Sequence, residues 1–208
     1  MAKQRLGMVI DTARCIGCQT CAMACKFENN LPRGVWWNKA KTIGGSHADT
    51  PSGQFPQVRM DFFTFSCQHC DNAPCAKVCP TGATHVREDG IVMMQTDRCI
   101  GCRYCMVACP YEGVRNFNWD EPTYDVSHAV GGTGIQEHRK GTVDKCSLCY
   151  HRVDAGLEPA CVHDCPARAR YFGDFADPDS EVSRLIATRD YYQLMPDQGT
   201  HPSVYFLK

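Results

Sequence analysis

The sequence lacks any apolar run near the roughly 18 to 20 residues that a membrane-spanning helix needs. It also lacks an excess of basic charge, since 22 Lys and Arg oppose 23 Asp and Glu, which gives no electrostatic support for nucleic-acid binding. Residues 1–14, MAKQRLGMVIDTAR, show neither the apolar segment of a secretion signal nor paired arginines. We find no dinucleotide-binding fingerprint and no Ser, His and Asp arrangement suited to nucleophilic catalysis.

Cysteine, in contrast, is abundant: 16 of the 208 residues are cysteine, and they form four groups of four with none left over. Groups one and three have the spacing C-x2-C-x2-C-x3-C, the iron–sulfur run whose fourth cysteine ligates the other cluster of a two-cluster ferredoxin. The sequence therefore predicts four [4Fe-4S] clusters. In chain order the groups are Cys15, Cys18, Cys21 and Cys25; Cys67, Cys70, Cys75 and Cys79; Cys99, Cys102, Cys105 and Cys109; and Cys146, Cys149, Cys161 and Cys165.

Two other uses of cysteine fit less well. Disulfide frameworks are typical of secreted scaffolds below roughly 100 residues, whereas this chain is longer and shows no secretion signal. Structural zinc sites pair C-x2-C motifs over roughly 12 to 20 residues, and of the four groups only group four, with residues 150–160 between Cys149 and Cys161, comes near this spacing. The spacing of group four by itself does not distinguish a zinc site from an iron–sulfur cluster. Because group four occurs in a chain with the other cysteine groups, iron–sulfur clusters are favoured.

Cluster binding would change the charge of the chain. Each oxidised cluster with its four thiolates carries about −2, so four clusters would take the net charge from −1 to about −9. Positive charge near a ligand raises the reduction potential of a cluster, although each basic residue has solvated surface charge as its alternative role. The basic residues close in sequence to the cysteines are Arg14, Lys26, Lys77, Arg98, Arg103, Lys145, Arg152, Arg168 and Arg170.

The segments between the cysteine groups are short and rich in Gly and Pro, so a large apolar core is not expected. Thiolate ligation that exists only in the folded state is itself folding free energy. We therefore expect the clusters to supply much of the stability and the apoprotein to be largely unfolded.

The chain repeats itself, because DTARCIGCQTCAMAC at 11–25 matches TDRCIGCRYCMVAC at 96–109. Groups two and four form a second matched set, since each opens with C-x2-C and closes with x3-C-Pro. The turn residues REDG at 87–90 predict a hairpin, and helical turns are expected after Cys21 and Cys105. Runs of strand length precede the groups at residues 6–11, 60–66, 90–95 and 141–144. The pattern predicts an α+β fold in which a ferredoxin-like unit is used twice.

Two further segments, residues 26–61 and 111–140, exceed the roughly 12 to 15 residues of a structureless connection. We expect them to cover the clusters and to offer surface to a partner. Beyond the last cysteine group, residues 179–188 have helical periodicity, and residues 198–208 predict an extended tail that lies along a partner.

The sequence offers no open coordination site. His69 and His163 lie within groups two and four, but a Rieske centre would replace two cysteines with histidines, and every group already has four cysteines. Because no iron would remain open to substrate, we expect an electron-transfer protein that is not itself an enzyme.

The four groups, together with CQHCDNAPCAKVCPTGA at 67–83 and REDGIV at 87–92, resemble the four-cluster iron–sulfur subunit of molybdopterin oxidoreductases. The resemblance covers residues 6 to about 173. The segment DPDSEVSRLI at 177–186 resembles the polysulfide, thiosulfate, tetrathionate, arsenate and cytochrome-linked nitrite reductase branch, and the chain is also similar to the dimethyl sulfoxide reductase subunit. The resemblance implies an electron relay through four [4Fe-4S] clusters between a large molybdenum or tungsten molybdopterin catalytic subunit and a quinone-linked membrane subunit or another redox partner.

The same resemblance implies a crossed ligand scheme with four sulfur sets. In the nitrate reductase branch a tryptophan replaces the ligand that matches Cys102 and yields a three-iron cluster, whereas here the cysteine is retained. The implied sets are A (Cys15, Cys18, Cys21 and Cys165), B (Cys146, Cys149, Cys161 and Cys25), C (Cys99, Cys102, Cys105 and Cys79) and D (Cys67, Cys70, Cys75 and Cys109).

The resemblance further implies two interleaved bacterial-ferredoxin-like lobes with loop insertions and a C-terminal tail. The first lobe would face the catalytic subunit and the second the quinone-side membrane subunit. The implied parts are 1–27 with 141–175 for the first lobe, 60–110 for the second, 28–59 and 111–140 for the insertions, and 176–208 for a C-terminal helix and tail.

Two other functions stay open. A hydrogenase or a formate dehydrogenase could use a similar electron-transfer subunit, and a self-contained iron–sulfur enzyme or metal-storage protein is an alternative of another class. Since residues 1–14 show no signal, we expect the chain either to stay in the cytoplasm or to reach the periplasm folded, with a partner that carries a twin-arginine signal. It would be peripheral to the membrane wherever a membrane subunit exists.

Overall fold

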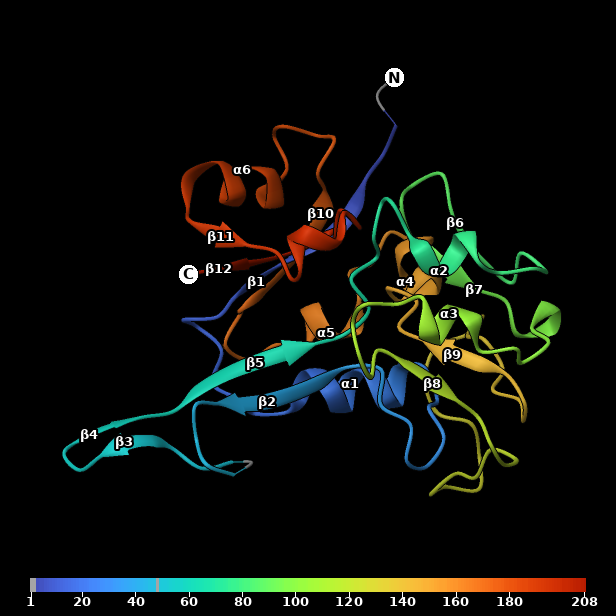
Figure 1. Ribbon diagram of the computed structural model, residues 1–208, viewed down its shortest axis with the longest axis horizontal. Helices are drawn as coiled ribbons and strands as arrows, with labels where there is room; N and C mark the ends of the chain where they lie inside the picture. Colours follow the sequence, from blue (N-terminus) through green and yellow to red (C-terminus); the bar gives the residue numbers. More distant parts are fainter. Residues whose placement is uncertain (1–2, 48) are drawn as a thin grey trace.

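The computed structural model describes residues 3–47 and 49–208 and has an α+β fold of short helices and small sheets (Figure 1). The strands are β1 (Leu6–Asp11), β2 (Lys39–Ile43), β3 (Ser52–Gln54), β4 (Gln57–Arg59), β5 (Asp61–Phe65), β6 (Thr84–Val86), β7 (Val92–Met94), β8 (Arg115–Phe117), β9 (Val143–Lys145), β10 (Arg170–Asp174), β11 (Tyr191–Tyr192) and β12 (Val204–Leu207). The helices are α1 (Thr20–Glu28), α2 (Pro74–Lys77), α3 (Tyr104–Val107), α4 (Tyr150–Val153), α5 (Ala160–His163) and α6 (Glu181–Thr188), with 3-10 turns η1 (Thr96–Arg98) and η2 (Pro196–Gln198). Among the described residues, no helix has the length and apolar character to cross a membrane.

The largest sheet joins the two ends of the chain in the order β10-β1-β12-β11. β1 lies antiparallel to β10, with Leu6 opposite Asp174, and parallel to β12, with Met8 opposite Val204. Every residue of β1 is buried, as expected of a central strand covered on both faces. The predicted strand at residues 6–11 is thus confirmed, and α6 packs against β1 and β10.

The C-terminal tail corrects one prediction from the sequence. Instead of lying along a partner, β12 lies inside the chain's own sheet between β1 and β11, and Phe206 is 0% exposed. The Phe206 ring stacks against Phe63 and Tyr192, with centroid distances of 5.2 and 5.3 Å. The prediction was wrong because a short apolar strand fits the open edge of β1 as well as it fits another protein, and the sequence does not show that this edge is free.

Smaller hairpins carry the rest of the chain. β6 and β7 form the predicted hairpin, closed by a hydrogen bond of 2.9 Å from Arg87 N to Ile91 O. β2 and β5 pair antiparallel, and the β3–β4 hairpin extends beyond them as an arm with Phe55 at its tip, at the lower left of Figure 1. β8 pairs with β9, which brings Arg115 opposite Lys145.

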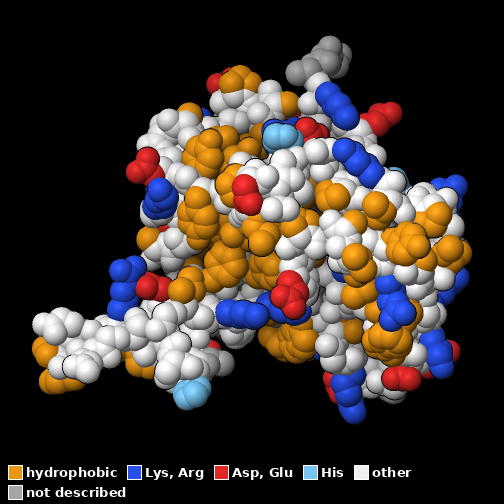
Figure 2. All heavy atoms as spheres, viewed as in Figure 1, with side chains coloured by type: hydrophobic (Ala, Val, Ile, Leu, Met, Phe, Trp, Pro, Cys, Tyr) orange, Lys and Arg blue, Asp and Glu red, His pale blue; other side chains and the backbone are white. Residues whose placement is uncertain are grey.

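The core contains both aliphatic side chains and cysteines. At the surface, apolar side chains are spread over the face that Figure 2 shows. One cluster of buried residues is free of cysteine and joins Val9, Val182, Tyr205 and Leu207 at the large sheet. Another consists of Leu31 and Trp37 with three cysteines of different groups. The apolar core around the large sheet is more extensive than the composition led us to expect, whereas the rest of the core depends on sulfur.

Helix α6 begins at a side-chain cap, which sets its start two residues after the predicted 179. The Ser180 hydroxyl accepts a hydrogen bond from Ser183 N at 3.2 Å and donates to Asp174 O at 2.7 Å. We expect Ser180→Ala to lower the free energy of unfolding by about 1 kcal/mol, because it removes the cap. The measurement is anaerobic urea unfolding, with Thr188→Ala at the exposed end of the helix as control; equal effects from the two variants would contradict the role of the cap.

Candidate functional site

All sixteen cysteines are free thiols, so none of them forms a disulfide. The exposure of the cysteines distinguishes sulfur sets A and C, which reach the surface, from sets B and D, which are mostly buried. Cys18 and Cys102, which occupy the same position in the repeated CIGC motif, are exposed. The four cysteines of set B are all buried, and of set D only Cys109 is partly exposed.

The cysteines of set A line one cavity. It lies between the loop after β1, the start of α1 and the loop after α5, and it holds about 370 Å³ of empty space, including solvent at its mouth. Ile10, Ala169 and Arg170 complete its wall. The cysteines at this cavity are Cys15, Cys18, Cys21 and Cys165.

A second cavity is built in the same way from the repeated motif. It holds about 270 Å³ of empty space, including solvent, beside α3 and the β6–β7 hairpin. Met94 and Val143 form apolar wall, and Thr84 lies at its edge. The cysteines at this cavity are Cys79, Cys99, Cys102 and Cys105, the members of set C.

The cysteines of set B are mutual neighbours in the interior. Burial raises the pKa of Cys25 well above its usual value, and the thiols of Cys146, Cys149 and Cys161 raise it further. Thiols raise one another's pKa only at short range, because the effect is repulsion between two thiolates. Cys25, on α1, thus joins three cysteines more than a hundred positions later in the chain.

Set D shows the same relation. Burial raises the pKa of Cys70 to about 12, and the neighbouring thiols of Cys67 and Cys75 contribute to the rise. Burial also raises the pKa of Cys109 to about 11, again with contributions from Cys67 and Cys75. Cys109, from group three, is therefore a neighbour of group two.

These thiols fit an iron–sulfur group. Ligation requires deprotonated sulfur, and several thiolates buried together are costly unless positive charge is placed between them. Within residues 3–47 and 49–208, no three Cys, His, Asp or Glu side chains converge as ligands of a single metal ion. At the two cavities the sulfur atoms surround a volume, which a multi-iron cluster would fill.

Neighbouring sets are linked in a fixed order. Burial raises the pKa of Cys161 in set B, and Cys21 in set A adds to this rise. Burial and then the set D thiol of Cys67 raise the pKa of Cys146 in set B. Burial raises the pKa of Cys105 in set C, with a contribution from Cys75 in set D. The four sulfur sets therefore lie next to one another in the spatial order A–B–D–C.

Backbone N–H groups point at several of the sulfur atoms. Thr84 N donates to Cys79 Sγ at 3.3 Å, and Ala169 N donates to Cys165 Sγ at 3.3 Å, each from the loop that follows a Cys-Pro pair. Such hydrogen bonds stabilise the charge on sulfur and raise the reduction potential of a bound cluster. They also explain why both loops turn back toward their own cysteine.

Two glycines allow the repeated CIGC loops to pass close to other parts of the chain. Gly17 and Gly101 have φ values of +67° and +70°, which L side chains rarely adopt. A Cβ atom would lie 2.2 Å from the Phe62 ring at Gly17 and 2.2 Å from Gly141 O at Gly101. The loops that carry Cys18 and Cys102 therefore require glycine for both conformation and space.

The basic residues singled out from the sequence separate into two kinds. Lys145 and Arg170 are buried among the cysteines. Arg14 instead donates to Tyr171 Oη at the surface, and Arg103 stacks on the Trp119 ring at 4.8 Å. Arg98 and Arg168 are exposed as well.

Sequence reasoning missed Arg115, which is buried beside the thiols of sets C and D. Arg115 begins β8 after Cys109-Pro110, just as Arg170 begins β10 after Cys165-Pro166. This shared position, an arginine opening the strand after a Cys-Pro, is the signal that could have found it.

The two histidines within the cysteine groups have other contacts. His69 is buried, and its Nδ1 accepts a hydrogen bond from Val92 N at 3.2 Å. Burial lowers the pKa of His69 well below its usual value, so the ring is neutral. His163 is exposed and lies 2.7 Å from Asp164 through its Nδ1.

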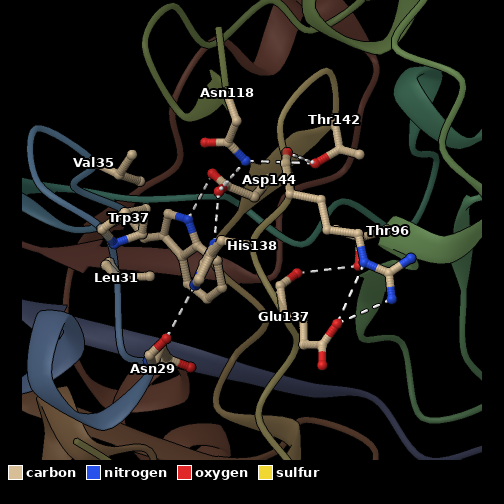
Figure 3. A network of polar contacts seen from close by, with 12 residues as sticks. Asn29, Leu31, Val35, Trp37, Thr96, Asn118, Glu137, His138, Thr142 and Asp144 are labelled. Carbon is tan, nitrogen blue, oxygen red and sulfur yellow. Dashed lines mark hydrogen bonds and ion pairs between the residues drawn. The ribbon is translucent and has the colours of Figure 1, made fainter. Parts of the chain in front are cut away.

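A buried polar network joins residues of the two insertions around Asp144 (Figure 3). Asp144, fully buried just before Lys145, accepts hydrogen bonds from Trp37 Nε1 at 2.9 Å and from Asn118 Nδ2 at 3.1 Å. His138 Nδ1 lies 3.0 Å from the same carboxylate. Trp37 comes from the first insertion, and Asn118 and His138 come from the second. Side chains of both insertions thus meet at the carboxylate of Asp144.

The network continues to sulfur through Asn29. His138 Nε2 lies 3.1 Å from Asn29 O, so both ring nitrogens of His138 face oxygen atoms. Asn29 Nδ2 donates to Cys25 O at 2.9 Å and lies 3.7 Å from the Sγ atoms of Cys25 and Cys149. The two insertions are therefore connected by hydrogen bonds to two cysteines of set B.

Comparison with known proteins gives matches over nearly the whole chain. Two family models, both described as 4Fe-4S dicluster domain, match residues 14–83 and residues 58–126 with 133–175. A protein of Halobacterium salinarum named for a dimethyl sulfoxide reductase iron-sulfur subunit is 52% identical over 97% of this chain and 78% of its own length.

Two further relatives are more distant. The arsenate respiratory reductase iron-sulfur subunit of a Shewanella strain is 40% identical over 98% of this chain and 96% of its own length. A tetrathionate reductase subunit of Salmonella typhimurium is 39% identical over 99% of this chain and 73% of its own length. Together with the sixteen cysteines, the two dicluster matches are consistent with four [4Fe-4S] clusters.

Proposed function

Since the chain belongs to the family of iron–sulfur subunits of molybdopterin oxidoreductases, we propose that it relays electrons through four [4Fe-4S] clusters between a molybdenum or tungsten catalytic subunit and a second redox partner. When bound, such clusters accept and donate single electrons at fixed positions. The observation that carries the proposal is the order of the sulfur sets. The outer sets A and C each reach the surface through one exposed cysteine, and the inner sets B and D are enclosed between them.

The ligand scheme we propose is the crossed one, with the four sets defined above. It is supported at A and C by the two cavities that four cysteines line. It is supported at B and D by the mutual effects of the thiols, which connect Cys25 to group four and Cys109 to group two. In each case the fourth cysteine of one group sits with the first three of another.

We further propose that the two lobes are interleaved, with the first formed by both ends of the cysteine region. β1 pairs with β10 and α1 packs on α5, which brings residues 6–28 against residues 160–174. The second lobe, residues 60–110, contains the β6–β7 hairpin and the packed helices α2 and α3. Rigid placement of the sets is what this architecture contributes, because electron tunnelling falls steeply with distance.

The exposed ends of the two outer sets are the proposed docking places for redox partners. Ile16 beside Cys15 is 60% exposed, and Ile100 beside Cys99 is 65% exposed. The end at set C also has exposed Val107, two residues after Cys105, and exposed Trp119, whose ring packs against Arg103. Apolar and aromatic side chains of this kind are enriched at interface centres. By family resemblance, we assign the set A end to the catalytic subunit and the set C end to a quinone-linked membrane subunit.

The location of the chain follows from these partners. In our proposal it is exported folded with a catalytic subunit that carries the signal, or it stays in the cytoplasm with a catalytic subunit that does not. In either compartment it is peripheral to the membrane and reaches quinone through a membrane subunit.

The proposal is tested by anaerobic purification of the native complex and identification of the large subunit and its metal. We expect a molybdenum or tungsten subunit, chemically reducible iron–sulfur signals in electron paramagnetic resonance, and no turnover by this chain alone. A nickel-containing partner would favour the hydrogenase alternative. Turnover of small substrates by the isolated chain would favour a self-contained enzyme.

A matched pair of variants tests the ligand scheme. Cys18→Ser and Cys102→Ser change equivalent positions in sets A and C, so each is expected to lose or convert one cluster and leave three intact. The loss should be about one iron per chain where a three-iron cluster forms and about four where the whole cluster is lost. Iron analysis and electron paramagnetic resonance should show a different cluster affected in each variant. Unchanged iron content, or the same signal altered in both variants, would contradict the scheme.

A further inference from the structure

The structure buries very few of the chain's basic side chains. Among the described residues, the Lys and Arg side chains in the buried class are Arg115 (5% exposed), Lys145 (2%) and Arg170 (5%). They open β8, close β9 and open β10, respectively. Their shared burial, in a chain with 22 Lys and Arg, calls for a physical cause.

None of these three cations has a carboxylate partner. Within residues 3–47 and 49–208, every ion pair of Lys or Arg is formed by other residues, such as Arg87 with Asp154 or Arg33 with Asp125. A buried cation without a counter-charge is strongly destabilising. The compensating negative charge must therefore come from another source, and sulfur is what surrounds these side chains.

Arg170 lies between sets A and B. It lines the cavity of set A, and its Nη1 donates to Cys161 Sγ of set B at 3.5 Å. Nη2 is held by Asn38 Oδ1 at 3.1 Å, which fixes the direction of the guanidinium. Consistent with this position, the thiols nearest to its charge are Cys161 of set B and Cys21, Cys165 and Cys15 of set A.

Arg115 occupies the corresponding place between sets C and D. Its Nη1 donates to Thr84 Oγ1 at 3.4 Å, at the edge of the set C cavity. Its Nη2 is buried and has no hydrogen-bond partner among the described residues, so a donor remains available. Its guanidinium lies beside the thiols of Cys105 in set C and of Cys67 and Cys75 in set D.

Lys145 lies at the remaining junction, between sets B and D. It precedes Cys146 of set B, and its Nζ donates to Cys146 O at 2.8 Å and to Val92 O. Val92 N in turn donates to the ring of His69, which lies in the loop between Cys67 and Cys70 of set D. The side chain of Lys145 is thus held by the backbone of Cys146 in set B and by Val92, which is hydrogen-bonded to the loop of set D.

We propose that Arg170, Lys145 and Arg115 are internal counter-cations, one at each junction of the order A–B–D–C, that raise the reduction potentials of the two clusters beside them. The proposal rests on the proposed function and assigns these residues as positioning and tuning residues within it. A cluster gains negative charge on reduction, and a fixed cation nearby stabilises the reduced form more than the oxidised form. Burial makes the effect larger than that of a solvated charge, which salt and water screen.

The proposed role also explains why the three cations lie at the ends of β8, β9 and β10. β8 pairs with β9, with Arg115 opposite Lys145 in register, and β10 belongs to the large sheet. A cation at the end of a paired strand is held by backbone hydrogen bonds. It therefore cannot move away from the sulfur sets as a cation on a flexible loop could.

The test compares buried and exposed arginines in the purified complex. Arg115→Gln and Arg170→Gln remove the proposed charge, and Arg98→Gln and Arg168→Gln are matched controls, since both are exposed yet adjacent in sequence to sets C and A. The midpoint potential of each cluster is measured by redox titration followed by electron paramagnetic resonance. Arg115→Lys and Arg170→Lys keep the charge.

We expect Arg115→Gln to lower the potentials of clusters C and D and Arg170→Gln to lower those of A and B. The expected change is at least tenfold in each reduction equilibrium, which is about 59 mV for one electron. The other two clusters, both exposed controls and the Lys variants should stay close to the unaltered protein. Unshifted potentials in the Gln variants, or equal shifts in all four clusters, would overturn the proposal while leaving the electron-relay function intact.

A folding defect is also interpretable. If the Gln variants assemble no clusters and the Lys variants do, cluster assembly itself requires the buried charge, as the proposal demands. If the Lys variants fail as completely as the Gln variants, the shape of arginine and not its charge is what the site needs, and the proposal is overturned.

Discussion

Anaerobic removal of iron with a chelator is expected to unfold most of the chain. One group of buried core residues consists of Leu31 and Trp37 with Cys25, Cys67 and Cys146. Without iron, the centre of this group would be three thiols that bind no metal. Burial and thiol–thiol repulsion already raise the pKa of Cys25, which means that these side chains are unfavourable neighbours as thiolates. Iron supplies the positive charge that makes their burial stable.

Unfolding should be uneven along the chain. The cluster of Val9, Val182, Tyr205 and Leu207 has no cysteine, so the large sheet and α6 are expected to keep part of their structure longest. Residues 60–165 should lose their structure first, because most of their buried core residues pack against cysteines.

Hydrogen exchange measured by mass spectrometry, before and after chelation, tests this prediction. Protection should disappear from β6, β7, α2 and α3 and remain longest in β1 and β12, and ferrous iron with sulfide should restore it. Full protection of residues 60–165 after complete loss of iron would show that the apolar core is sufficient by itself.

Much of the fold could be predicted because the cysteine loops fix their flanking elements. The strand at 6–11 and the β6–β7 hairpin follow from local alternation and turn residues, which depend only on nearby sequence. α3 spans Tyr104–Val107, so the helical turn that the sequence predicted after Cys105 is present but begins one residue before that cysteine.

The parts that escaped prediction all depend on contacts between distant segments. β12 lies beside β1, and Arg115 reaches the cysteines only because β8 pairs with β9. Trp37, His138 and Asp144 come from segments that are far apart in sequence, and none of them belongs to a spacing motif. Their types are ordinary for surface or core, so only the folded structure shows that they meet.

Removal of the buried carboxylate at residue 144 is expected to be among the most destabilising single substitutions outside the cysteines. In Asp144→Ala the N–H donors of Trp37 and Asn118 lose their acceptor, and His138 Nδ1 loses the carboxylate oxygen that it faces. Breaking a buried pair by removing one partner costs about 3–5 kcal/mol. The measurement is the midpoint of anaerobic urea unfolding, and the free energy derived from it.

Asp125→Ala is the matched control, because Asp125 pairs with Arg33 at the surface, where both side chains are more than half exposed. Surface pairs contribute about 0–1 kcal/mol, so this variant should be close to the unaltered protein. Equal losses from the two aspartate variants would show that Asp144 stabilises no more than an exposed carboxylate does.

A double-mutant cycle then separates the histidine pair from the rest of the network. Asp144→Asn and His138→Gln each leave one partner buried without its counterpart, whereas the double variant removes both partners. We expect the double variant to lose less stability than the sum of the single losses, with a coupling of about 1–3 kcal/mol. Additive losses would mean that His138 and Asp144 do not stabilise each other. Non-additive losses would indicate that a direct interaction between His138 and Asp144 holds the two insertions together.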